Sequence, residues 1–121
     1  MFSVELAVTP EEQARGLMFR PSIPQDAGMI FVMEPDRQAN FWMRNTMISL
    51  DLVFIDRSGV VESISERAVP FSERQLSSKG PVRAVLEING GLSEELGIVP
   101  GIQAIHEIFT TAPNEHRCPA G

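Results

Sequence analysis

Short apolar runs, each interrupted within a few residues by proline, glycine or a polar turn, most constrain what this chain can fold into. The 121 residues include nine prolines and nine glycines, and both residue types weaken or end helices. The runs between them alternate in polarity or are continuously apolar, as half-buried and buried strands do. The pattern predicts a mainly β protein: a compact antiparallel β-sandwich or barrel of about seven short strands with one or two short helices. A layered α/β fold is disfavoured, because the expected strands lack long helices between them.

The expected strands follow these runs along the chain. Residues 57–59 read as a tight turn between two of them, which predicts a hairpin. Residues 34–38 are expected to form another turn, and residues 66–81 a loop long enough to be the lid or rim of a site. Strands are predicted at residues 2–8, 28–33, 41–47, 50–56, 60–65, 82–88 and 103–109.

Two helices are expected, and both are short. Thr9 can cap the first helix, Pro10 suits its first position, and Glu12 completes a capping box. This helix should span residues 10–17. The second should cover residues 92–96, where apolar and acidic residues lie between glycines.

The chain has the length of one domain. With 121 residues it can bury one core but not two, so residues 1–109 are expected to form a single β-rich domain. Residues 110–121 are polar and contain two prolines, which predicts a flexible C-terminal tail. No apolar run is long enough to cross a bilayer, and no signal-peptide pattern precedes the first expected strand, so membrane insertion is not expected.

Charge and composition disfavour several classes of function. A net charge of −6 argues against a nucleic-acid partner, which requires a basic face. Cys118 is the only cysteine, which excludes an intramolecular disulfide and a cysteine-based zinc site. His106 and His116 have no partner at ligand spacing, and the chain has no phosphate-binding loop or serine elbow. The sequence therefore predicts no cofactor or metal, and it favours a non-enzymatic protein over an enzyme.

The segment from Phe41 to Asp51 combines aromatic and polar side chains and holds the only tryptophan. In a strand, Trp42 and Arg44 share one face, so the guanidinium can stack on the indole ring. Asp51 can pair with Arg44 across a hairpin, whereas Asn45 would face the core and pin a loop by hydrogen bonds. This arrangement predicts a shallow pocket for a carboxylate, phosphate or sugar. The alternative is an ion pair under a tryptophan lid that stabilises the sheet.

Two further residues are candidates for the same site. Arg20 follows the first helix and either points toward the Trp42 region or interacts with the carboxyl end of the helix. Glu87 interrupts the apolar run 82–88, so it is expected to face a polar pocket. Asp51 and Glu87 together would form an acid/base pair of the kind used in hydrolysis.

Several segments, taken in order, carry a recognisable set of motifs. They are residues 9–20, Gly28-Met-Ile-Phe31, Phe41-Trp-Met-Arg-Asn-Thr46, residues 50–56, Gly59-Val60 and Val85-Leu-Glu-Ile-Asn-Gly-Gly91, and the motif residues are Arg15, Arg20, Trp42, Arg44, Asn45, Thr46, Asp51, Glu87 and Asn89. Together these segments resemble the bacterial and archaeal family called domain of unknown function 192. The resemblance implies a compact β-sandwich or barrel with short helices, and no established activity, substrate or cofactor. It also implies that many relatives are exported, which favours a periplasmic or exported location and leaves a cytoplasmic one open.

Three hypotheses of function follow from these observations. The leading one is a non-enzymatic binding or accessory module of the bacterial envelope, which holds a small anionic or sugar-like ligand, or a partner's peptide, near Trp42, Arg44 and Asp51. The second is a hydrolase or lyase that uses Asp51 and Glu87 as acid and base, with Arg44 or Arg20 stabilising an anion. The third is a structural or protein-interaction domain, which would show an exposed apolar patch.

Overall fold

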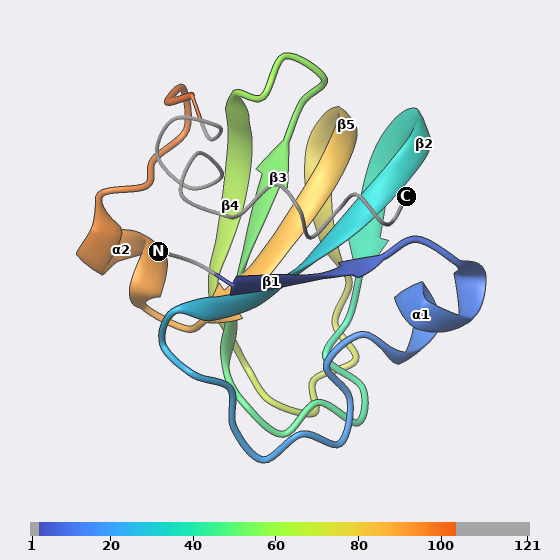
Figure 1. Ribbon diagram of the computed structural model, residues 1–121, viewed down its shortest axis with the longest axis vertical. Coiled ribbons are helices and arrows are strands. Elements are labelled where there is room, and N and C mark those ends of the chain that lie inside the picture. Colours follow the sequence, from blue (N-terminus) through green and yellow to red (C-terminus); the bar gives the residue numbers. More distant parts are fainter. Residues whose placement is uncertain (1–2, 104–121) are drawn as a thin grey trace.

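The computed structural model describes residues 3–103, and one five-stranded sheet lies at its centre (Figure 1). The strand order across the sheet is β1-β2-β5-β3-β4. The described sheet stays open, with β1 and β4 at its edges, and two short helices lie on either side of it in Figure 1. The elements are β1 (Ser3–Ala7), α1 (Pro10–Arg15), β2 (Ala27–Phe41), β3 (Leu50–Ile55), β4 (Val61–Ala68), β5 (Leu76–Asn89) and α2 (Leu92–Leu96).

The mainly β prediction with two short helices is confirmed, but the strand number is lower than expected. The predicted strand 41–47 is wrong, because β2 ends at Phe41 and the chain then turns. The predicted strand 103–109 lies outside the described residues except for Gln103, which forms an isolated bridge with Val60. The described part of the chain therefore holds five strands.

Two strands are longer than the sequence pattern predicts. β2 continues through the expected turn at 34–38, and its pairing with β5 shifts register between Val32 and Arg37. β5 begins at Leu76, inside the expected loop 66–81, most of which is strand. Irregular pairing of this kind lets a strand pass through residues that locally favour a turn. Pairing between residues distant in sequence thus overrides the local signal.

One strand pair is parallel, which the antiparallel prediction did not include. β1 pairs with β2 in parallel register, and α1 lies in the connection between them. The capping box of α1 is present as predicted: the Thr9 hydroxyl accepts from the backbone N–H of Glu12, and the Glu12 carboxylate accepts from the N–H of Thr9. The helix ends at Arg15, because Gly16 has a left-handed φ of 48° and lies against Phe31.

The sheet separates two apolar clusters, and β3 contributes to both. Leu52 and Phe54 belong to one cluster, whereas Val53 and Ile55 belong to the other. Side chains alternate between the faces of a strand, so Val85 of β5 lies in the first cluster and Leu86 in the second. By the same alternation Glu87 projects toward the first cluster, the side on which α1 lies.

The described helices are all too short to span a bilayer: between residues 3 and 103 there is no helix with the length and apolar character that a membrane crossing requires.

Candidate functional site

The segment after β2, residues 42–49, forms a turn, and backbone hydrogen bonds hold it against two other loops. The backbone N–H of Phe19 donates to the Asn45 carbonyl at 2.9 Å, and that of Phe71 donates to the Thr46 carbonyl at 3.0 Å. These contacts hold the three loops together at the lower end of the sheet in Figure 1. Asn45 is exposed and has a left-handed φ of 56°. The expectation of a core-facing Asn45 side chain is therefore wrong, and backbone carbonyls hold the loops.

Arg44 stacks on Trp42 as the sequence suggested but does not pair with Asp51. Its guanidinium carbon lies 5.2 Å from the centroid of the Trp42 ring, within the range of a cation–π contact. The nearest carboxylate is that of Glu73, with a nitrogen–oxygen distance of 3.8 Å, and both side chains are exposed. The predicted Arg44–Asp51 ion pair is wrong because residues 42–49 turn instead of forming one arm of a hairpin.

Asp51 is fully buried, and its carboxylate accepts four hydrogen bonds from the protein. One carboxylate oxygen accepts from the backbone N–H of Arg67 at 2.8 Å and of Gly91 at 3.0 Å. The other accepts from the N–H of Ser93 at 2.9 Å and from its hydroxyl at 2.6 Å. These four hydrogen bonds fasten β4 and the first turn of α2 to β3.

Two other motif residues fix the loop between α1 and β2. The Arg20 guanidinium forms two hydrogen bonds with Glu5 of β1, at 2.6 and 2.8 Å, and these lower the pKa of the Glu5 carboxyl. The Asn89 side-chain amide donates to the carbonyls of Ile23 and Pro24, at 3.1 and 3.2 Å. Arg20 and Asn89 therefore hold this loop against the first and the central strand.

Asp51 and Glu87 cannot form the predicted acid/base pair. In the pairing of β3 with β5, Asp51 lies opposite Ile88 and Leu52 lies opposite Glu87. Asp51 therefore projects from the Ile88 face of the sheet, and Glu87 from the Leu52 face. Two carboxylates on opposite faces of a sheet share no reacting centre.

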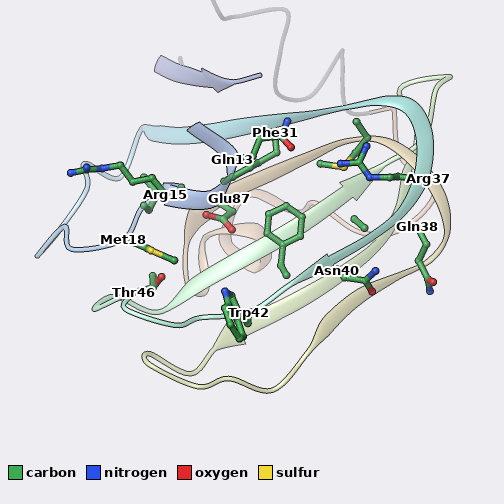
Figure 2. A pocket seen from close by; sticks show the side chains of 16 residues that line it. Gln13, Arg15, Met18, Phe31, Arg37, Gln38, Asn40, Trp42, Thr46 and Glu87 are labelled. Carbon is green, nitrogen blue, oxygen red and sulfur yellow. The ribbon is translucent and has the colours of Figure 1, made fainter. Parts of the chain in front are cut away.

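A cavity of about 420 Å³ opens on the Glu87 face, between α1 and the two halves of β2 (Figure 2). In Figure 2, Glu87 lies between Gln13 and Trp42, and Arg15 and Arg37 lie on opposite sides. Of the predicted residues, Trp42 and Glu87 line the cavity, as do the motif residues Arg15 and Thr46. The other lining residues are Gln13, Ala14, Gly16, Leu17, Met18, Phe31, Met33, Arg37, Gln38, Ala39, Asn40 and Phe41.

Glu87 is the unusual group of this cavity. It is only 5% exposed, and within residues 3–103 its carboxyl group has neither a hydrogen bond nor an ion pair. No side-chain oxygen of the described residues is both fully enclosed and unpaired, so the carboxyl oxygens open into the cavity. Burial raises its pKa to about 8, because removal from water disfavours the charged form. At neutral pH the carboxyl group is mainly protonated and can both donate and accept a hydrogen bond.

The walls of the cavity combine aromatic and apolar side chains with polar ones. The rings of Phe31 and Phe41 meet edge to face, with centroids 4.9 Å apart and an interplanar angle of 87°. Trp42 lies at the rim with 44% of its surface exposed. The Gln13 side-chain amide is occupied, since it donates to the carbonyls of Ala7 and Val32 at 2.9 and 2.8 Å.

The rim carries two cationic groups that no carboxylate of residues 3–103 neutralises. Arg15 and Arg37 are exposed, and neither guanidinium forms an ion pair or a hydrogen bond in the described part of the chain. The carboxylate next to Arg37 in sequence, Asp36, is engaged elsewhere: it accepts from Arg83 at 2.6 Å and from Arg57 at 2.9 Å. Those hydrogen bonds lower the pKa of Asp36, with Arg83 the larger cause.

Comparison with known proteins identifies the family of this chain. The family model for DUF192, described as "Uncharacterized ACR", matches residues 1–106. The chain belongs to the DUF192 family. A crystal structure of a protein of unknown function from Novosphingobium aromaticivorans is similar, with 52% identity, a TM-score of 0.80, and coverage of 81% of this chain and 70% of that one. A Sinorhizobium meliloti protein with the provisional name of a transcription regulator is similar at 44% identity and a TM-score of 0.79, covering 81% of this chain and 76% of that one. Among curated proteins none matches.

Several cavity residues of this DUF192 protein were not found from its sequence. Phe31 lies in the predicted strand 28–33, and no local pattern singles out Gln13, Arg37 or Asn40, because the bend of β2 depends on its pairing with β5. Two local signals point to the cavity: Trp42, the only tryptophan, and Glu87, an acidic residue in an otherwise apolar run. Among residues 3–103 no three histidine, cysteine or acidic side chains are grouped so that they could hold a metal ion.

Proposed function

We propose that this DUF192 chain is a binding domain for a small organic ligand, which occupies the cavity between α1 and β2. The observation that carries the proposal is the carboxyl group of Glu87, which opens into the cavity and has no hydrogen bond from residues 3–103, although the residue is only 5% exposed. Polar groups with so little access to water nearly always have a hydrogen-bond partner. A ligand that reaches Glu87 would supply that partner.

The position of the cavity moves the expected binding site away from Arg44 and Asp51. Trp42 remains part of the proposed site, but Arg44 and Asp51 interact with other protein groups and do not line the cavity. The aromatic wall suits a ring or apolar chain, and the exposed Asn40 and the two rim arginines suit polar groups at the outer end. A role in the bacterial envelope is also part of the proposal, and it rests only on the location that the family resemblance implies.

The cavity can be closed by a substitution that leaves the core intact. Ala14 lies on α1, is exposed, and lines the cavity. Ala14→Phe would place a ring in the cavity mouth, whereas Glu95→Phe places the same ring on α2, which contributes no lining residue. Binding of small amines, carboxylates and sugars can be followed through Trp42, the only tryptophan. We expect Ala14→Phe to weaken binding about tenfold or more and Glu95→Phe to leave it unchanged; equal affinity in both variants would refute the proposal.

An exposed aromatic pair favours a second candidate function, a protein-interaction surface. Phe19 and Phe71 are 59% and 60% exposed, and each has a left-handed φ of 66°. Bulky residues in this conformation cost roughly 1–3 kcal/mol each, and such strain occurs mainly at functional positions. Self-association is the first form to test, by sedimentation of the wild type and of Phe71→Gly, which relieves the backbone strain and removes the ring. A monomeric wild type at high concentration would argue against this form.

A further inference from the structure

The acidic and basic groups that line the cavity lie at different depths. Glu87 on β5 is the only acidic side chain among the described lining residues, and it is nearly inaccessible to water. The two cationic side chains, Arg15 on α1 and Arg37 on β2, are both exposed. Across the sheet Glu87 faces Met29 and Leu52, neither of which carries a charge. The inner end of the cavity therefore offers one acidic group, and its rim offers two basic groups.

Aromatic and thioether side chains share the lining with this acidic group. Phe31, Phe41 and Trp42 belong to the wall, together with Met18 and Met33. The faces of aromatic rings carry negative partial charge and attract cations, most strongly where water is excluded. Sulfur is polarizable and packs well against irregular apolar ligands. A carboxyl group with several aromatic rings is the combination that holds an organic ammonium ion.

We propose that the ligand of this cavity is an organic amine whose ammonium group binds Glu87 and whose apolar body lies among Phe31, Phe41 and Trp42. This inference rests on the proposed binding function and names its ligand class. An anionic group at Glu87 could accept a hydrogen bond from the protonated carboxyl, but the negative faces of the aromatic rings would repel it. A neutral hydroxyl would provide a hydrogen bond but no charge for the aromatic rings to attract. The ammonium group satisfies both the carboxylate and the rings.

Binding involves one proton in addition to the ligand. In the free protein the Glu87 carboxyl is mainly protonated at neutral pH, because burial raises its pKa to about 8. An ammonium group beside it favours the ionised form, as opposite charges do. The carboxyl proton then passes to the solvent, and the ligand keeps its own proton. The complex contains a carboxylate–ammonium pair in place of a neutral carboxyl group.

Three probes of nearly equal size separate this ligand class from the alternatives. 2-Phenylethylamine, 2-phenylethanol and 3-phenylpropanoate share a ring and a short chain and differ in their terminal group. Titrations at pH 8 can be followed by calorimetry and by Trp42 fluorescence on the full chain. We expect the amine to bind about tenfold or more tightly than the alcohol and the carboxylate.

The variant Glu87→Gln keeps the size of the side chain and removes its ability to ionise. We expect it to lose the preference for the amine and to bind the alcohol within about twofold of the wild type. The exposed Glu66 gives a control, since Glu66→Gln makes the same chemical change away from the cavity. Circular dichroism and thermal unfolding establish that both variants are folded.

The outcomes distinguish failure of the ligand class from failure of the site. If the alcohol or the carboxylate binds as tightly as the amine, or if Glu87→Gln keeps the amine preference, the ammonium inference is wrong while the cavity remains a binding site. If no probe binds at millimolar concentration and Trp42 fluorescence does not change, the inference and the proposed function both fail.

Discussion

Asp51 and Glu87 are one position apart in the register of neighbouring strands, yet they project from opposite faces of the sheet. Leu52 pairs with Glu87, and Asp51 pairs with Ile88. The Asp51 carboxylate accepts four hydrogen bonds from the surrounding protein, whereas the Glu87 carboxyl group has none from residues 3–103. The first carboxylate therefore stabilises the fold, and the second is available to a ligand. Substitution of Asp51 should therefore lower stability, whereas substitution of Glu87 should change how stability and binding depend on pH.

The raised pKa of Glu87 should make stability fall as pH rises. The folded state keeps the carboxyl protonated up to a pKa of about 8, while the unfolded chain releases the proton near its ordinary value of about 4.3. Between these values the folded state binds more protons, so the free energy of unfolding decreases by roughly 1.4 kcal/mol per pH unit. Urea unfolding at several pH values from 5.5 to 8.5 would measure this slope.

The variant Glu87→Gln isolates this contribution, because it removes the titrating group and keeps its shape. We expect it to be less sensitive to pH than the wild type across the same range and more stable at pH 8. Glu66→Gln should retain the slope of the wild type. Parallel curves for the wild type and Glu87→Gln would show that burial does not shift the Glu87 pKa as described.

Asp51→Ala should be one of the most destabilising single substitutions in the described chain. It leaves buried donors of Gly91 and Ser93 without an acceptor, and unsatisfied buried groups cost about 1–3 kcal/mol each. We expect a loss of about 3 kcal/mol or more in the free energy of unfolding. Ser93→Ala removes a single hydroxyl donor from the same cluster and should cost about 1 kcal/mol. Equal effects of the two substitutions would contradict a structural role centred on Asp51.

Arg44→Ala should leave both the fold and ligand binding nearly unchanged. Arg44 is exposed, does not line the cavity, and lies 3.8 Å from the exposed Glu73. Exposed ion pairs contribute about 0–1 kcal/mol, and the stack on Trp42 contributes on the order of 0.5–1 kcal/mol. Chemical denaturation and titration with 2-phenylethylamine would measure the two effects. A tenfold loss of affinity in a folded Arg44→Ala protein would show that Arg44 contributes to ligand binding.

Gly28 is required where β2 lies against β5, because the space there admits no side chain. A Cβ atom at this position would lie 2.6 Å from the Glu87 carbonyl oxygen and 2.9 Å from the Ile88 side chain. Because the first contact is with backbone, Gly28→Ala should separate the strands and destabilise the protein by about 1–3 kcal/mol. Gly97→Ala is a useful comparison, since nothing lies within 4 Å of its Cβ position and only its left-handed φ of 73° opposes the change. Thermal unfolding should therefore show the larger loss for Gly28→Ala.

The fold was more predictable than the site, for a physical reason. The capping box of α1 and the hairpin of β3 and β4 depend on residues close in sequence, so local patterns identified them. The bend of β2 and the early start of β5 depend on their pairing with each other, which no local window contains. Arg37 and Asn40 reach the cavity only through that pairing. Glu87 was recognisable because a charge in an apolar strand conflicts with burial wherever the strand lies.

The affinity for an amine should rise with pH if its ammonium group pairs with ionised Glu87. Below a pKa of about 8 most of the free protein carries a protonated carboxyl, so each pH unit should increase the affinity about tenfold. The increase should end near pH 8 and reverse only where the amine itself loses its proton, at about pH 10. The rim arginines stay charged throughout this range, so they do not contribute to the slope. Calorimetry of 2-phenylethylamine binding from pH 6 to 9, in buffers of different ionisation enthalpy, would count the protons released on binding. If the affinity is constant with pH in both the wild type and Glu87→Gln, the carboxyl group is not the partner of the ammonium ion.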